Sequence, residues 1–524
     1  MEAVAGLSRS PPSTVNNRSH LRPGVRWSTT SLVLGAVLAQ FGCQSAPPRD
    51  SPLPLRIAFG IGPTGQASGL STVAGLLYGE PLIAHDASGR PQPGLAESWA
   101  WADAGRRLTL QIKPDVQFHD GSTLTAQLVA DFLQSVLDGP PADLPLGFER
   151  VTSVKASGAH TVTITLSRPD FFLLTALNEL RMLHPDDDDV GTGPFRLVQR
   201  EPTLEAERFD AYHGGMPGTH RVQILTYDSH RSAWAALLRG EVDAAQEITR
   251  DAVDFMERSS NVATFATPQP FYIGVIFNHR HPAFANRAVR RAVNLALDRT
   301  RIVNQAMRGL GFVAHGPIWR DHWAYETPDS PPSFDPRKAI ALLDSAGFPM
   351  KAGAPGRPAS RFAFTCLFYS EDPQYERIAL MVQRQLFDIG IDVRLEPATQ
   401  RQLGQRSSLG QFDALLTPAN AGRSLMFTYR FWDTAAPGGA IFQTAYSGAN
   451  EAFEQLRNST SDDEVRASVA SLDARFQEDV PAAFLAWTQV TRAISTAIQV
   501  GTDAPDPFMS MWQWQRTDRG TPTP

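Results

Sequence analysis

The first stretch with a possible chemical signature spans residues 60–65 and matches the spacing G-x-G-x-x-G of dinucleotide-binding loops. That chemistry needs a helix whose N-terminal amides hold the pyrophosphate, and an acidic residue about 20 positions further on. Here Pro63 interrupts the turn, and the candidate acid, Glu80, stands at the end of a predicted helix. We therefore expect a glycine-rich loop after a first strand, with Gly65 and Gln66 in contact with a ligand.

Four histidines, His279, His281, His315 and His322, lie in one region of the sequence. Because imidazole is a common metal ligand, metal or haem capture is one possible function. The sequence contains no H-E-x-x-H, G-x-S-x-G, P-loop or C-x-x-C motif, and the acidic run at 186–189 lacks the spacing of a calcium loop. We therefore expect no enzymatic activity, no cofactor and no resident metal.

The N-terminal segment has the organisation of a secretory leader. Residues 1–30 are polar and basic, and the apolar run at 31–41 is too short to cross a bilayer, which takes about 20 residues. Gly42-Cys43 predicts a signal peptide over 1–42, lipidation of Cys43, and a linker to a membrane anchor over 43–52. Cleavage after Ala39 would instead release a free secreted protein. The other cysteine, Cys366, predicts a buried strand position rather than a disulfide.

Composition narrows the class of partner. The chain of 524 residues has a net charge of −6, with 42% apolar and 19% charged residues. The basic residues of the leader make the remainder more acidic still, which excludes a nucleic-acid backbone as ligand.

Periodicity predicts the elements that position these residues. A strand over 108–118, a turn at 119–121 and a helix over 125–137 with Thr125 as its N-cap follow one another. Further helices are predicted over 286–306, 336–346, 373–389 and 400–407, and strands over 271–277, 362–368, 391–395 and 412–416. Alternating strands and helices indicate an α/β protein in which helices cover the faces of mixed sheets.

Several motifs, in order over 53–500, resemble those of the bacterial extracellular solute-binding proteins of family 5, the peptide- and nickel-type receptors of ABC importers. They lie at 95–99, 116–129, 191–195, 210–215, 240–243, 277–278, 288–299, 333–349 and 386–393. The segment at 288–299, Ala-Val-Arg-Arg-Ala-Val-Asn-Leu-Ala-Leu-Asp-Arg, is the strongest single match.

The resemblance implies a type II periplasmic-binding-protein-like fold with two lobes that close over a solute at a hinge. Lobe I would comprise 53–85, 190–269 and 484–524, with an extra subdomain over 86–189 packed on it, and lobe II would comprise 270–483. The chain would cross between the lobes near Gln269 and near Pro481. Closure of this kind needs only a few residues that absorb backbone rotation.

One loop departs from the family pattern. In peptide-binding relatives, the loop after the strand at 412–416 carries an aspartate for the amino terminus of the peptide, whereas here it contains Arg423 and no acid before Asp433. An anionic or neutral ligand suits Arg423 better, unless Arg423 is a surface charge. We expect this loop, the aromatic segment after it and the hinge to contact the ligand. The expected contact residues are Asn420, Arg423, Ser424, Phe427, Trp432, Tyr446, Gln269 and Tyr272. Some of the aromatic rings could equally belong to the hydrophobic core.

The resemblance thus predicts the substrate-binding component of an ABC importer, which captures a peptide-like or other small solute and presents it to a permease. A monomer in the periplasm or cell envelope, attached to the membrane through its lipid, is expected. The alternative is a solute-sensing or metal- or haem-capturing receptor of the same fold without its own importer.

Overall fold

The computed structural model describes residues 53–61, 69–140, 144–201, 203–330, 332–353, 359–501 and 506–517. The predicted leader, Cys43, and the loop residues Gly65 and Gln66 lie outside these ranges. Among the helices within them, none is both long and apolar enough to cross a bilayer.

The largest sheet has eleven strands in the order β11-β12-β13-β1-β14-β20-β15-β19-β17-β18, with β16 paired to β20. Its strands are β1 (Leu55–Gly60), β11 (Phe195–Gln199), β12 (Leu204–Arg208), β13 (Arg221–Tyr227), β14 (Ala244–Ile248), β15 (Val262–Phe277), β16 (Gly311–Val313), β17 (Phe362–Tyr369), β18 (Ile391–Ala398), β19 (Ala414–Asn420) and β20 (Ala482–Ser495). The sheet is mixed, as predicted. β1 is parallel to β13 and β14, and β17 is parallel to β18 and β19, whereas β15 and β20 are antiparallel to their neighbours.

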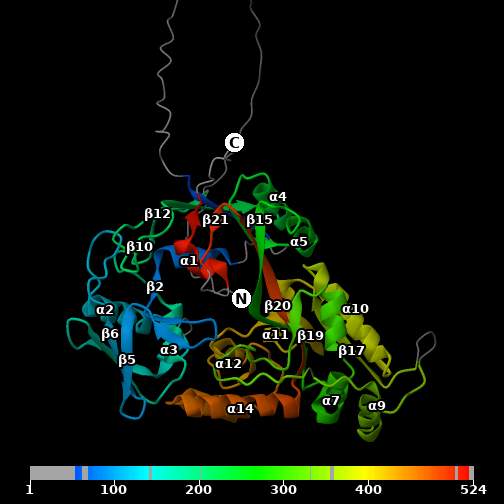
Figure 1. Ribbon diagram of the computed structural model, residues 1–524. Coiled ribbons are helices and arrows are strands. Elements are labelled where there is room, and N and C mark those ends of the chain that lie inside the picture. The colour runs from blue at the N-terminus through cyan, green and yellow to red at the C-terminus, as the bar shows by residue number, and fades with distance from the viewer. Residues whose placement is uncertain are drawn as a thin grey trace, which may run out of the picture. The chain divides into compact units, whose positions relative to one another are not determined.

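Two long strands, β15 and β20, connect the two parallel groups and run side by side (Figure 1). The first part of β15, residues 262–268, pairs with residues 489–495 of β20, and this part of β20 also pairs with β14. The second part of β15, residues 272–276, pairs with residues 482–487 of β20 and also with β19. The register shifts between Pro268 and Tyr272, so Gln269 lies at the irregularity. On β20 the change of partners falls after Trp487, further along the chain than Pro481.

Alternation along β15 divides the core between the two faces of the sheet. Tyr272 and Ile276 belong to one buried cluster, whereas Ile273 and Val275 belong to another. Helices α11 (Gln400–Ser408), α12 (Met426–Trp432), α13 (Asn450–Asn458) and α14 (Asp462–Asp479) contribute to the first cluster. Helices α6 (Pro282–Ala285), α7 (Arg287–Leu295), α9 (Pro336–Ser345) and α10 (Pro373–Phe387) contribute to the second.

The single helix predicted over 286–306 is interrupted. α7 ends at Leu295, and the chain continues with the short α8 (Arg299–Arg301) and a π-helical turn, η3 (Ile302–Ala306). Asp298 caps the restart, because its side chain accepts from the amide of Arg301 at 2.9 Å. The buried Arg299 donates to the carbonyls of Phe484 and Leu297 instead of extending into solvent. These tertiary contacts override the continuous helical pattern.

The remaining elements flank the first strands. α1 (Leu70–Tyr78) joins a cluster with β1 and the 3-10 helix η4 (Pro507–Gln513), and α4 (His230–Leu238) and α5 (Arg250–Met256) cover the neighbouring strands. In one small sheet, β9 (Arg181–His184) lies between β2 (Glu80–Pro81) and β10 (Asp187–Gly191) and pairs with both. In another, β21 (Ile498–Gln499) pairs with β22 (Gln515–Arg516). A hairpin joins β3 (Ile83–His85) to β4 (Pro91–Pro93).

Residues 96–166 build a separate antiparallel sheet in the order β5-β6-β8-β7. Its strands are β5 (Ala96–Ala102), β6 (Arg107–Ile112), β7 (Val151–Ala156) and β8 (Thr161–Leu166), accompanied by α2 (Ala126–Leu137), the single turn η2 (Phe148–Arg150) and α3 (Leu173–Glu179). The predicted N-cap of α2 is confirmed, because Thr125 Oγ1 accepts from the amide of Leu128 at 3.2 Å.

His119 joins two of the sequence motifs. Its Nδ1 accepts from the amide of Gly191 at 3.2 Å, and its Nε2 lies 3.0 Å from the carbonyl of Gly193. The turn after β6 is thereby attached to the segment that leads into β11, which ties the four-stranded sheet to the large one.

Candidate functional site

The loop after β19 is held in place by its own side chains and by β15. Asn420 Oδ1 accepts from the amide of Gly422 at 2.9 Å, and Gly422 has a positive φ of 66°. The amide of Ala421 donates to the carbonyl of Pro270 at 2.8 Å. The loop therefore lies beside the irregular part of β15, next to Gln269, where the two groups of strands meet.

Arg423 stands in this loop with a half-buried side chain. Among the described residues, its guanidinium has neither a hydrogen-bond partner nor an ion-pair partner. Burial lowers the pKa of Arg423, while the charges of Asp506, Asp321 and Asp86 oppose that shift. These three acids come from the C-terminal segment, from the segment before α9 and from the β3–β4 hairpin. Arg423 therefore lies where three distant parts of the chain converge.

Two of these acids have closer partners than Arg423. Asp506 forms a buried ion pair with Arg492, with Oδ2 2.7 Å from Nη2. Asp86 accepts from Ser88 and Arg90 within its own turn, which helps to lower its pKa despite the opposing effect of burial.

The third acid, Asp321, is exposed and lies 3.4 Å from the side chain of Arg320. The Arg423 guanidinium is consequently the group at this junction whose charge is least compensated. Its planar fork of donors fits a carboxylate or phosphate.

The β3–β4 hairpin fixes one side of the junction. Gly89, at its tip, has a φ of 78° and lies so close to Arg423 that a Cβ there would be 1.7 Å from the Arg423 carbonyl oxygen. The amide of Trp323 donates to the carbonyl of Ser88 at 3.1 Å, and the Arg90 guanidinium lies 4.7 Å from the centre of the Trp323 ring. The partners of this hairpin tip lie more than 200 residues away in the sequence and leave no local signal.

Two histidines that sequence reasoning did not combine also lie here. His85 on β3 and His322 beside Trp323 interact electrostatically, and burial lowers their pKa values to about 4 and about 3. The Nε2 atom of His322 is buried and has no hydrogen-bond partner among the described residues. Both rings are therefore neutral at physiological pH.

The predicted contact residues fall into two groups. Asn420, Phe427 and Gln269 keep part of their surface exposed, and Ser424 borders the same loop at 9% exposure. By contrast, Tyr272, Trp432 and Tyr446 lie inside the core of the α12–α14 face.

The polar atoms of these three core rings are already bonded within the protein. Trp432 Nε1 donates to Tyr272 Oη at 3.1 Å, and Tyr446 Oη donates to Asp479 at 3.1 Å. Because these rings pack against other side chains, we do not expect them to contact a ligand.

The histidines at 279–322 lie in separate environments. His281 caps α6 by accepting from the amide of Ala283 at 3.3 Å, and His315 bonds to the carbonyl of Ser330 at 2.8 Å. His279 packs on Tyr446, and His322 stacks on Trp323. Across the described part of the chain, no group of three or more His, Cys, Asp or Glu side chains is placed to hold a metal ion.

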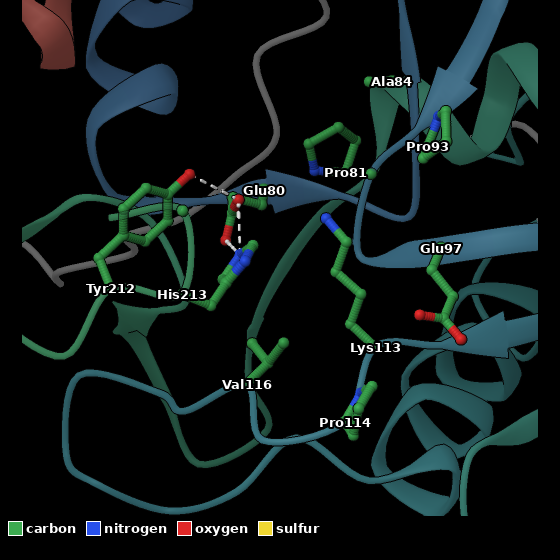
Figure 2. A pocket seen from close by; sticks show the side chains of 12 residues that line it. Glu80, Pro81, Ala84, Pro93, Glu97, Lys113, Pro114, Val116, Tyr212 and His213 are labelled. Carbon is green, nitrogen blue, oxygen red and sulfur yellow. Dashed lines mark hydrogen bonds and ion pairs between the residues drawn. The ribbon is translucent and has the colours of Figure 1, made fainter. Parts of the chain in front are cut away.

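A cavity of about 520 Å³ lies elsewhere, between β2, the end of β6 and the loop at 212–214 (Figure 2). On one wall, the Glu80 carboxylate accepts from Tyr212 Oη at 3.0 Å and contacts His213 Nε2 at 2.9 Å. Figure 2 shows the Lys113 side chain extending toward the strand that carries Glu80. Every lining residue comes from 80–116 or 212–214; the cavity touches the β3–β4 hairpin at Ala84 and Pro93 but includes no residue of the Arg423 loop.

The fold defines the class of protein. Two groups of strands joined by two crossing strands, with a separate small sheet inserted after the first elements, form a type II periplasmic-binding-protein fold. NikA of Brucella suis, solved in complex with Fe(III)-EDTA, superposes with a TM-score of 0.77 at 22% identity, and the match covers 89% of this chain and 100% of that one. AppA of Bacillus subtilis, solved with a nonapeptide, gives 0.71 at 22% identity, with 88% and 99% covered. These likenesses concern the fold alone.

Sequence comparison identifies the family. Residues 90–439 match the model of the bacterial extracellular solute-binding proteins, family 5, and the chain belongs to this family of solute-binding proteins. It is 26% identical over 389 residues to the probable D,D-dipeptide-binding periplasmic protein DdpA of Escherichia coli, which covers 70% of this chain and 72% of that protein. It is 27% identical over 329 residues to the oligopeptide-binding protein AppA of Bacillus subtilis, with 58% and 60% covered.

Proposed function

We propose that this protein is the substrate-binding component of an ABC importer and that its solute carries a carboxylate or another planar anionic group bound by Arg423. Family membership supports solute binding, and its relatives include proteins named for binding D,D-dipeptides, oligopeptides and glutathione. The observation that carries the choice of solute is the half-buried Arg423 guanidinium, which lacks a partner among the described residues.

The solute site lies where the Arg423 loop, the hairpin at 83–93 and the segment around Asp506 converge. A receptor that closes on its solute needs walls from both groups of strands, and Arg423 meets charges from both. The cavity of Figure 2 does not meet this requirement, because all its walls belong to 80–116 and 212–214. Asn420, Ser424, Phe427 and Gln269 complete the proposed contacts, and Gly65 and Gln66 belong to them by sequence.

The strand pairing supports a position for the proposed hinge. We place it at 268–272 of β15 and at 487–491 of β20, where both strands change partners. Lobe I then contains 53–85, 190–269 and the C-terminal segment, and lobe II contains the strands β17, β18 and β19. Only a few residues need to rotate at such a hinge.

The leader and the family support a proposal for the location and partners of the protein. We propose export to the periplasm, cleavage before Cys43, lipidation of that cysteine, and delivery of the solute to a permease by a monomer that performs no chemistry on it. The basic, apolar leader and the name of the periplasmic relative support this proposal.

The first experiment identifies the solute. Native mass spectrometry of the mature protein purified from its own cell envelope should show a bound compound with at least one carboxylate. In parallel, thermal unfolding with a D,D-dipeptide, glutathione and an oligopeptide should reveal a rise in melting temperature for a true solute, because a ligand of the folded state stabilises it by mass action. A bound compound without any anionic group would overturn the role assigned to Arg423, and turnover of the compound would overturn the receptor function.

A further inference from the structure

A buried ion network joins the segment 86–189 to α13. Its centre is Asp170, which is 2% exposed. Arg457 Nε donates to Asp170 Oδ2 at 3.1 Å, and a second guanidinium nitrogen of Arg457 contacts the same oxygen. On the other side, Arg150 Nε lies 3.2 Å from Asp170 Oδ2 as an ion pair. Asp170 and Arg150 precede residue 190, whereas Arg457 lies some 290 positions further on.

A second layer of charges completes this network. Glu149 accepts from Arg457 Nη2 at 2.5 Å, and Arg150 Nη2 lies 3.2 Å from Glu454. Arg150 also donates to the side chain of Asn458 at 2.9 Å. We call the set Glu149, Arg150, Asp170, Glu454 and Arg457 the Asp170 network. Across the interface, Arg457 faces Glu149 and Asp170, and Arg150 faces Glu454, so these three ion pairs exist only while the two parts stay together.

Apolar contacts reinforce the same interface. Phe172 is fully buried and, together with Leu146, belongs to the core cluster formed mainly by α12, α13 and α14. Its ring centre lies 5.2 Å from that of Tyr429, and the amide of Phe171 donates to the carbonyl of Arg457 at 2.8 Å. The segment that was expected to pack on lobe I thus also inserts side chains into the core of lobe II.

The network is linked to the proposed solute site through α12. Arg457 Nη1 donates to Tyr429 Oη at 3.1 Å, and Tyr429 stands on the helix that begins directly after the Arg423 loop. The hairpin at 83–93 makes a parallel contact, because Arg90 pairs with Asp462 at the start of α14. Movement of the segment 86–189 away from lobe II would therefore disturb both the network and the wall beside Arg423.

We propose that the Asp170 network is a closure latch that holds the segment 86–189 against lobe II in the absence of solute and thereby sets the apparent affinity for it. Separation would take Arg457 away from Glu149 and Asp170, and Arg150 away from Glu454, while Asp170 would keep only Arg150. Buried charges that lose a partner are strongly unfavourable unless they regain water. Because the apparent dissociation constant equals the intrinsic constant divided by the fraction of binding-competent protein, a weaker latch weakens binding without touching the solute. The effect on affinity rests on the proposed function, whereas the latch itself does not.

The latch is tested without any solute by measuring the distance between spin labels. Ser135 on α2 and Ser345 on α9 are exposed and lie on opposite sides of the interface. Each is replaced by cysteine in a Cys43→Ser background, which leaves the buried Cys366 as the remaining cysteine. Pulsed electron spin resonance then gives the distance distribution for the unaltered latch, for Arg457→Met and for Asp170→Asn.

The matched control is Arg361→Met. Arg361 is also a buried arginine, but its partners, the carbonyls of Ile389 and Phe348 and the carboxylate of Asp344, all lie within lobe II. We expect one narrow distribution for the unaltered latch and for Arg361→Met, and a broader distribution with longer distances for Arg457→Met and Asp170→Asn. Circular dichroism establishes that each variant is folded.

Several results would overturn the latch. They are a broad distribution with the latch unaltered, unchanged distances in both network variants, an equal broadening in Arg361→Met, or loss of folding in both network variants. Once a solute is known, Arg457→Met should lower the affinity for it by about tenfold or more, as expected when the closed fraction of the protein falls to one tenth. An altered distance with unchanged affinity would retain the latch and reject its control of binding. Absence of any solute would reject the proposed function alone.

Discussion

Gly89 rests directly on the main-chain carbonyl of Arg423, and this contact fixes the hairpin against the proposed solute loop. Gly89→Ala combines the strain of a positive φ with a Cβ that would lie 1.7 Å from the carbonyl oxygen, so the backbone has to shift. Gly121→Ala is the matched control, because Gly121 has a φ of 89° and open space around its Cβ position. We expect urea unfolding to show a loss of about 1–2 kcal/mol for Gly121→Ala and a clearly larger loss for Gly89→Ala. Equal losses would mean that the hairpin does not rest on the loop.

Arg423 should not be replaceable by lysine. A lysine keeps the charge but lacks the planar fork that binds a carboxylate through two parallel hydrogen bonds. Truncation of one member of a buried, hydrogen-bonded charge pair costs roughly 2–5 kcal/mol. We therefore expect Arg423→Ala to lower the affinity for the solute at least about thirtyfold, and Arg423→Lys to recover only part of that loss.

Calorimetric titration with the identified solute measures both effects. Arg401→Ala is the control, since Arg401 is an exposed arginine on α11. Affinities for Arg423→Ala equal to those of Arg401→Ala would show that Arg423 does not meet the solute.

Stability should decrease below neutral pH because of His85 and His322. Burial lowers their pKa values to about 4 and about 3, from an unfolded value of 6.5. Between these values the unfolded chain binds more protons than the folded one, so the contribution to stability is complete above pH 6.5 and is lost as the pH falls through the folded pKa values. Each histidine should lower the free energy of unfolding by up to about 1.4 kcal/mol per pH unit below 6.5.

Urea titrations at pH 7, 6 and 5 check this pH dependence. In the wild type, His322 Nδ1 accepts a hydrogen bond from the amide of Ala324 at 3.2 Å. His322→Asn keeps an acceptor for this amide. The variant should therefore remain folded and lose part of the slope. An unchanged slope would show that His322 does not titrate as a buried group.

Tyr272 should matter for stability and not for binding. Tyr272→Phe removes the acceptor of Trp432 Nε1 and leaves that buried donor without its partner, which costs about 1–3 kcal/mol. The side chain lies in the core, so the affinity for solute should change less than about twofold, well under the effect of one hydrogen bond to a charged group. Chemical unfolding and calorimetry measure the two quantities on the same sample. A large loss of affinity at unchanged stability would restore Tyr272 to the solute site.

Membrane attachment should depend on Cys43. The wild-type protein, once exported and lipidated, is expected to partition into the detergent phase, and Cys43→Ser is expected to remain in the aqueous phase. Mass spectrometry of the mature N-terminus decides where cleavage occurs. Cleavage after Ala39 with an unmodified Cys43 would contradict the anchor, and retention of residues 1–42 would contradict export itself.

The local features were predictable from the sequence because they depend on neighbours a few residues apart. Thr125 was expected to cap α2, and this cap is present. The helix predicted over 336–346 is α9, and Asp335 caps it by accepting from the amide of Lys338 at 2.9 Å. The alternation along β6 and the mixed sheets with helices on their faces followed from periodicity alone. The family motifs then indicated how such elements are assembled.

Other features were decided only by the tertiary structure. Trp432 and Phe427 stand on the same helix and read alike in sequence, yet one is enclosed in the core and the other is partly exposed, because this depends on what packs against each face. One partner of Asp170, Arg457, lies 287 residues away, and no local pattern encodes such a pairing. The proposed site depends on charges that chain folding brings together, and on Arg423, which has no ion-pair partner among the described residues. Residue types and spacing determine which elements form, whereas burial and long-range contact decide which of their side chains remain available to a solute.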